Sequence, residues 1–268
     1  IADYFSVMAE QGLGKNMAKS MKHWAESTKV VDKTRRGNIY KYTISDMGEL
    51  IFSDKGDRYL QYSDTIWLLH YLMVTNHKKN ALWYYLFNCF SSEVFTKDSF
   101  INSLKAWLAR IEYPSIPNTK QLERDFNCCM NMYCLNESKR KRSMDEYFTS
   151  PFNQLQLISE NKGEYRLRRM SSLEISKEMF SFCLLDYLKN YPKNSDLPFS
   201  EIQHGEKSPG KVFNIVENTL VEYLESFEKM LKGTFEFEST AGMKTLFLMK
   251  EFPINYDKYL KKAFSIVS

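Results

Sequence analysis

Lysines recur at helical spacing near the start of the chain, where they could bind phosphate groups. Lys15, Lys19 and Lys22 lie in the segment GKNMAKSMKHW, so a helix would place their ammonium groups on one side. Such a helix could place positive charges beside phosphates and polar side chains near base edges. The alternative is a solvated helix face. The candidate nucleic-acid-binding residues of this helix are Lys15, Asn16, Lys19, Ser20, Lys22 and His23.

Two groups of arginines could also grip a DNA backbone. Arg35 and Arg36 fall in a predicted basic turn, residues 33–37, between two strand-like runs. The second group is Arg166, Arg168 and Arg169. Guanidinium groups suit phosphates and a narrow minor groove. The alternative for the second group is an exposed strand edge that its charges protect from aggregation.

Ser208 and Lys211 flank the dipeptide Pro209-Gly210. This order predicts a helix with Ser208 as its N-cap and proline at its first position, which is a structural role. A helix start can also hold a phosphate group. Ser208 and Lys211 are therefore further candidates for DNA contact.

No residue pattern identifies catalytic residues. Phosphodiester cleavage uses a metal held by carboxylates, or a nucleophile beside an acid or base. Asp54, Asp57 and Asp64 lie close together, but loop aspartates often serve turns and Asp64 is placed to cap the helix that follows. His70 lies on an apolar helix and is expected to be a hydrogen-bonded core residue. No metal site is assigned, and because no P-loop is present, any ATP use is expected to belong to partners.

Composition indicates an ordinary globular protein. The formal net charge is +4, which alone does not identify a nucleic-acid-binding protein. The five cysteines have spacings that fit neither a common disulfide framework nor a zinc site, which favours a reducing cytoplasm. No apolar run approaches the roughly 18 residues that cross a bilayer, so no membrane anchor is expected. The chain opens on Ile1 without a signal-peptide pattern, so its start is expected to lie upstream.

A helix, helix, hairpin order recurs along the chain. Near the start, Met17, Met21 and Trp24 form a face that could pack, and a hairpin with strand-like residues at its ends follows. The expected fold is mainly α with small β-hairpins, in tandem winged-helix-like units joined by a helical linker. The expected boundaries are 1–55 for a DNA-binding unit, 56–94 for the linker, 95–170 for a second unit and 171–268 for a C-terminal unit.

The second and third units have their own local signals. Asn118 and Gln121 resemble a capping box, and a hairpin is predicted to turn at residues 161–163. In the third, Thr219 and Glu222 resemble another capping box, and a hairpin is predicted to turn at residues 241–242. The aromatic linker helices, 63–74 and 81–90, are expected to form core or a homodimer contact.

Several separate strings resemble one bacterial family across nearly the whole chain. They are GLGKNMAKSMKHW, DKGDRYLQYSDTIWLLHYL, NTKQLERDF, SPFNQLQLI, SPGKVF and STAGMKTL, in that order. The family is a domain of unknown function found in DNA phosphorothioation and phage-defence gene clusters. The chain departs from it at Ser239, where Asp is usual, and in lacking the His-Glu-Thr-Phe segment of the family's start.

The resemblance implies a nicking component of a single-stranded phosphorothioation system. It implies DNA as a partner, with Mg or Mn as the metal if the chain nicks. It also implies a cysteine desulfurase, an ATPase and a sulfur transferase as further partners. The residues themselves indicate only DNA contact. A non-catalytic winged-helix adaptor or a transcriptional regulator remains the alternative.

Overall fold

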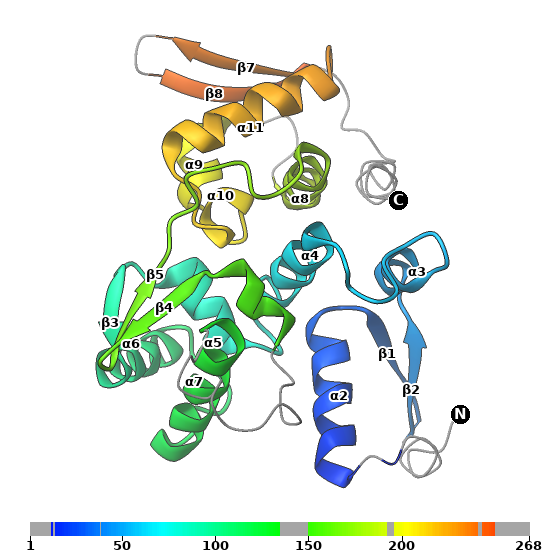
Figure 1. The fold of residues 1–268 in the computed structure, drawn as a ribbon, viewed down its shortest axis with the longest axis vertical. Coiled ribbons are helices and arrows are strands. Elements are labelled where there is room, and N and C mark those ends of the chain that lie inside the picture. The colour runs from blue at the N-terminus through cyan, green and yellow to red at the C-terminus, as the bar shows by residue number, and fades with distance from the viewer. Residues whose placement is uncertain are drawn as a thin grey trace.

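Helices predominate in the fold, and short antiparallel strands accompany them, which confirms the mainly α class with small hairpins. The computed structural model describes residues 12, 14–37, 39–134, 150–191, 196–240 and 243–249 (Figure 1). Within these residues the strands form one two-stranded and two three-stranded sheets. None of the helices in this part of the chain combines the length and apolar character that crossing a bilayer requires.

The N-terminal part consists of a helix, a hairpin and a second helix. The elements are α2 (Lys15–Ser27), β1 (Val31–Arg36), β2 (Ile39–Ile44) and α3 (Asp46–Phe52). Ser45 caps α3 by accepting a hydrogen bond from the Gly48 N–H at 3.0 Å. Gly48 allows α3 to approach the residue before β1 closely, because a Cβ there would lie 2.1 Å from the Val30 carbonyl oxygen. Local capping and close backbone packing thus fix α3 against the base of the hairpin.

Two expectations for this part are wrong. The predicted basic turn is mostly strand, since β1 runs to Arg36 and the chain turns at Gly37, whose φ is +60°. Met17 and Met21 are 61% and 51% exposed, so they do not form the packed face that their spacing predicted. Trp24 does pack, with its ring centroid 5.5 Å from that of Trp83.

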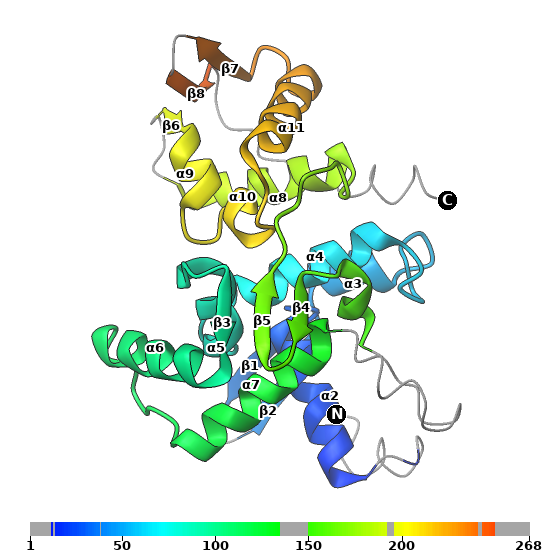
Figure 2. The same ribbon diagram turned by 60° about the vertical axis from the view of Figure 1, so that its left-hand side comes forward.

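The central apolar helix, α4 (Ser63–Val74), packs between the parts of the chain on either side of it. It is followed by α5 (Ala81–Tyr84) and the π-helical turn η1 (Tyr85–Cys89). Every residue of α4 after Ser63 is buried, as expected for a helix that is apolar on all sides. Figure 1 and Figure 2 both show α4 between the C-terminal unit and the rest of the molecule. The prediction that the linker helices form part of the core is therefore confirmed.

The segments predicted to form the second and third units share one strand connectivity. The second contains β3 (Val94–Thr96), α6 (Lys97–Arg110), α7 (Thr119–Tyr133), η4 (Pro151–Leu155), β4 (Ile158–Asn161) and β5 (Glu164–Leu167). The third contains α8 (Lys177–Lys189), β6 (Leu197–Pro198), α9 (Phe199–His204), α10 (Pro209–Val212), α11 (Glu217–Met230), β7 (Phe235–Thr240) and β8 (Met243–Leu248). Their sheet orders are β3-β5-β4 and β6-β8-β7, so in each the last strand lies in the middle.

Of the local features predicted in these segments, one helix cap and two hairpins are confirmed and one capping box is wrong. Asn118 does cap α7, accepting from the Gln121 N–H at 3.0 Å. Both predicted hairpins exist, as β4–β5 and β7–β8. The Thr219–Glu222 capping box is wrong, because α11 begins at Glu217 and Thr219 is a buried helical residue. The four-part domain division stays a prediction, since one hydrophobic core cluster extends from Val30 to Leu246.

His70 is a hydrogen-bonded core residue, as its apolar setting predicted, and it joins three parts of this core. Its Nε2 lies 3.2 Å from the Val212 carbonyl oxygen and its Nδ1 lies 2.7 Å from the Tyr133 hydroxyl oxygen. Burial lowers the pKa of His70 to about 4, so the ring is neutral near pH 7. A carbonyl only accepts, so Nε2 carries the single proton and Nδ1 accepts from the Tyr133 hydroxyl.

Acid is expected to destabilise the protein through His70. Its pKa is about 4 when folded and 6.5 when exposed, so the unfolded chain binds the proton first as pH falls. The free energy of unfolding should therefore fall by about 3 kcal/mol between pH 6.5 and 4 from this residue. Urea unfolding of the wild type and His70→Gln over this range measures the difference in slope. Equal slopes for the two proteins would contradict the assignment.

Candidate nucleic-acid interface

Helix α2 exposes the side chains predicted to contact DNA. Lys15, Lys19 and Lys22 are exposed along one side of the helix, at the spacing the sequence predicted. Asn16, Ser20 and His23 are exposed on the adjoining side. Partial burial and the nearby Lys79 ammonium lower the pKa of His23. Its imidazole is therefore neutral near pH 7 and can offer hydrogen bonds, but not a positive charge.

The β1–β2 hairpin adds a basic and aromatic face that was not predicted from the sequence. Lys33 pairs with Tyr42 and Arg35 with Tyr40, so these four side chains share one face of the hairpin. The Lys22 ammonium lies 4.5 Å from the centre of the Tyr42 ring, which places α2 over this face. Strict alternation of basic residues on β1 and aromatic residues on β2 was the signal available in the sequence.

Cation–π contacts hold this face together at its surface. The Lys33 ammonium lies 4.1 Å from the centre of the Tyr40 ring. The Arg35 Nε donates to the Gly37 carbonyl oxygen at 3.0 Å, which keeps its guanidinium near the hairpin tip. The side chain of Arg36 lies outside the described part of the chain. We name the surface formed by Lys15, Lys19, Lys22, Lys33, Arg35, Tyr40 and Tyr42 the α2–hairpin face.

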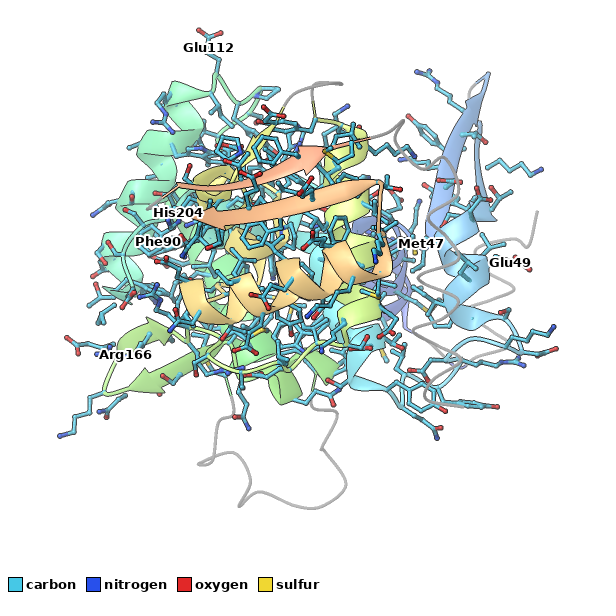
Figure 3. All side chains as sticks on the ribbon, turned by 90° about the horizontal axis from the view of Figure 1, so that it is seen from above. Met47, Glu49, Phe90, Glu112, Arg166 and His204 are labelled. Carbon is cyan, nitrogen blue, oxygen red and sulfur yellow. The ribbon has the colours of Figure 1, made fainter. Side chains whose placement is uncertain are left out.

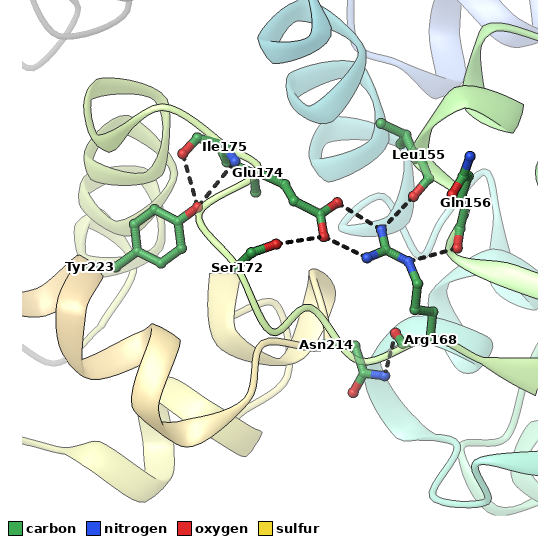
Figure 4. Close-up of polar contacts among 8 residues, drawn as sticks. All are labelled: Leu155, Gln156, Arg168, Ser172, Glu174, Ile175, Asn214 and Tyr223. Atoms are coloured by element: carbon green, nitrogen blue, oxygen red, sulfur yellow. Dashed lines mark hydrogen bonds and ion pairs between the residues drawn. The ribbon is translucent and has the colours of Figure 1, made fainter.

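Arg168 is partly buried and has a structural role, as Figure 4 shows. Its Nη1 and Nη2 bind the Glu174 carboxylate at 2.5 and 2.8 Å, in a bidentate pair. Its guanidinium also donates to the carbonyl oxygens of Leu155 and Gln156, at 2.7 and 2.9 Å. Asn214 in turn donates to the Arg168 carbonyl oxygen at 2.9 Å. These bonds join the second and third predicted units. The guanidinium that was a candidate for DNA contact therefore binds groups of the protein itself.

The other two arginines of this group lie at the surface. Arg169 forms an ion pair with Glu93, at 3.6 Å between Nη1 and Oε1. Arg166 is exposed on β5. Figure 3 places Arg166 on the opposite side of the molecule from Met47 and Glu49 of α3. The structure therefore does not bring Arg166 together with the α2–hairpin face.

Ser208 and Lys211 also lie away from that face. Ser208 is fully buried and accepts from the Lys211 N–H at 3.2 Å, as the N-cap of the four-residue helix α10. The Lys211 ammonium donates to the Phe90 carbonyl oxygen at 3.2 Å, and burial lowers its pKa. The predicted structural role of Ser208 is confirmed. Both side chains are used within the fold.

Asp57 and Asp64 each bind backbone N–H groups and do not meet in one shared site. Asp57 is buried and accepts from the backbone N–H groups of Gln61 and Tyr62 at 2.7 and 2.9 Å, a turn role as expected. Asp64 accepts from the Ser176 N–H at 2.9 Å instead of capping its own helix. Within the described residues, no three His, Cys, Asp or Glu side chains gather closely enough to hold a metal ion.

Comparison with known proteins gives the chain a family and a fold. Two crystal structures of SspB, one of them bound to magnesium, are similar to it, each with a TM-score of 0.84. Sequence identity is 18% and 19%, over 97% of this chain and 78% of theirs. No curated protein matches. Residues 3–264 match a family described as "Protein of unknown function (DUF4007)", and the chain therefore belongs to that family.

Proposed function

We propose that this chain is a DNA-binding component of a bacterial DNA phosphorothioation or phage-defence system, and that the α2–hairpin face contacts the duplex. The observation that carries the proposal is the gathering of five cations on this one face. They come from a helix and a hairpin placed side by side. Such an arrangement suits phosphates along a groove, since cations supply most of the affinity for DNA.

The strand connectivity supports a winged-helix interpretation of the later units. In each, a short strand is followed by helices and then by a hairpin whose last strand returns beside the first. We propose that α7 and α11 occupy the structural position of the recognition helix in these units, while duplex contact stays with the α2–hairpin face. Their surfaces differ, because α7 exposes Lys120 and Arg124 whereas α11 exposes Glu222 and Glu225. The C-terminal unit therefore suits a protein partner better than DNA.

Duplex binding measured over a series of salt concentrations tests the proposal. Five phosphate contacts predict that the logarithm of the binding constant falls with the logarithm of salt concentration at a slope of about −4.5. Fluorescence anisotropy of a labelled duplex of mixed sequence gives this slope. Absence of duplex binding in low salt would exclude the α2–hairpin face as a DNA-binding surface.

We further propose that the chain nicks DNA, and this proposal rests on the family resemblance. One of the similar SspB structures carries magnesium. With Mg or Mn present, we expect supercoiled plasmid to be converted to open circles, and a chelator to prevent the conversion. Conversion that a chelator leaves unchanged would contradict a metal-dependent reaction. Binding without conversion would favour an adaptor that works beside a desulfurase, an ATPase and a sulfur transferase, or a regulator of transcription.

A further inference from the structure

A cavity of about 500 Å³ lies between α2 and α7, next to the α2–hairpin face. Lys19, Ser20 and His23 of α2 line one side, and Gln121 and Asp125 of α7 line the other. Its floor comes from α5 and α6. Figure 1 and Figure 2 both show α2 and α7 along the same part of the molecule. Its volume is in the range of small-molecule sites, about 300–1,000 Å³.

The walls of the cavity suit a flat, apolar ring. Trp24 and Trp83 line it with their rings edge to face, at 5.5 Å between centroids and 80° between planes. Leu104 and Leu108 add aliphatic surface from α6. Aromatic and aliphatic side chains of this kind provide stacking surfaces for nucleobases, because every base has an apolar face.

The polar groups around the cavity suit the edge of a ring that carries donors and acceptors. The Gln121 side chain donates to the Asp125 carboxylate at 2.8 Å, and burial raises the pKa of Asp125. Ser20 and His23 line the cavity from α2, so hydrogen-bonding groups come from both of its sides.

The rim supplies positive charge where a phosphate attached to the base would lie. Lys19 lines the cavity and also belongs to the α2–hairpin face. Lys79 lines the same rim and forms an ion pair with Glu26. A ligand with a flat ring, a hydrogen-bonding edge and a phosphate would therefore meet a matching group in each part of the cavity.

We propose that this cavity binds a nucleobase whose phosphate lies at Lys19. The inference rests on the proposed binding of duplex DNA by α2. Two sources can supply this chemistry: a base turned out of the bound duplex, or a free nucleotide. Turning out a base costs the energy of unpairing and unstacking, which is smallest at a mismatch. A protein that holds such a base binds a mismatched duplex more tightly than a paired one.

The test compares a fully paired duplex with one that carries a single central mismatch. The wild type is expected to bind the mismatched duplex about tenfold more tightly. Cys128 lines the cavity with its side chain exposed, so Cys128→Trp fills the space from the outside. This variant, and Gln121→Ala, should lose the preference while binding the paired duplex with an unchanged salt slope. The matched control is Asn127→Trp, at the neighbouring exposed position outside the cavity lining, which should keep it.

Free nucleotides are tested by the quenching of tryptophan fluorescence with deoxynucleoside monophosphates. Saturable quenching that Gln121→Ala weakens, without a mismatch preference, would assign the cavity to a free nucleotide. Neither a mismatch preference nor saturable quenching would overturn the proposal. A mismatch preference that both cavity variants retain would also overturn it. Absence of all duplex binding would instead count against the DNA-binding function itself, so the two failures are distinguishable.

Discussion

Replacing Lys15, Lys19 and Lys22 together with Glu is expected to weaken duplex binding by roughly 500-fold at about 0.1 M salt. Each lost phosphate contact removes about 0.9 from the salt slope, so the slope should become shallower by about 2.7. The three side chains are exposed on α2. Their replacement should therefore leave the folded core unchanged. Anisotropy titrations at several salt concentrations measure both quantities.

A matched control distinguishes the effect of where the charges lie from the effect of the total change in net charge. Lys177, Lys229 and Lys232 are exposed in the C-terminal unit, and their replacement with Glu changes the net charge by the same amount. This control should retain most of the affinity and nearly the full salt slope, since its charges lie outside the proposed interface. Equal losses in the two triple variants would mean that only the overall charge matters, and that α2 has no special role.

Replacing Phe213 with Ala is expected to destabilise the protein by about 3–5 kcal/mol. Phe213 is fully buried, and its ring centroid lies 5.5 Å from that of Trp67 and 6.0 Å from that of Tyr71. It follows α10, whereas Trp67 and Tyr71 belong to α4. The substitution thus opens a cavity where the C-terminal unit meets the central helix. Urea unfolding followed by circular dichroism measures the loss.

Two further variants control this measurement. Phe213→Leu keeps most of the side-chain volume and should cost clearly less than Phe213→Ala. Tyr59 is 77% exposed, so Tyr59→Ala should change the free energy of unfolding by less than about 0.5 kcal/mol. If Phe213→Ala behaves like Tyr59→Ala, the C-terminal unit does not depend on this contact.

Local sequence signals predicted much of the secondary structure. The β4–β5 and β7–β8 hairpins and the Asn118 cap depend on neighbouring residues, which a reader of the sequence can see. The same kind of signal failed at Thr219, because a threonine followed three residues later by glutamate also occurs inside helices. It failed in β1 as well, where alternating basic residues belong to a strand rather than to a turn.

Whether a charged side chain is exposed or held by other groups depends on which groups the folded chain brings to it. Arg168 is held by Glu174 and by two carbonyl oxygens that an intervening loop and hairpin bring to it. Nothing in the sequence near Arg168 distinguishes it from the exposed Arg166. The cavity between α2 and α7 was likewise unpredictable, since its two sides come from residues about 100 positions apart in sequence.

The shared strand connectivity sets a folding order for the growing chain. Val94 of β3 pairs with Arg166 of β5, and Leu197 of β6 pairs with Leu246 of β8. Each first strand must therefore wait for the final strand of its own sheet to be synthesised before it can pair. Contacts so distant in sequence form slowly, because the intervening chain must first be ordered. On the ribosome, β3 and β6 would thus remain unpaired edges for longer than any other strands described.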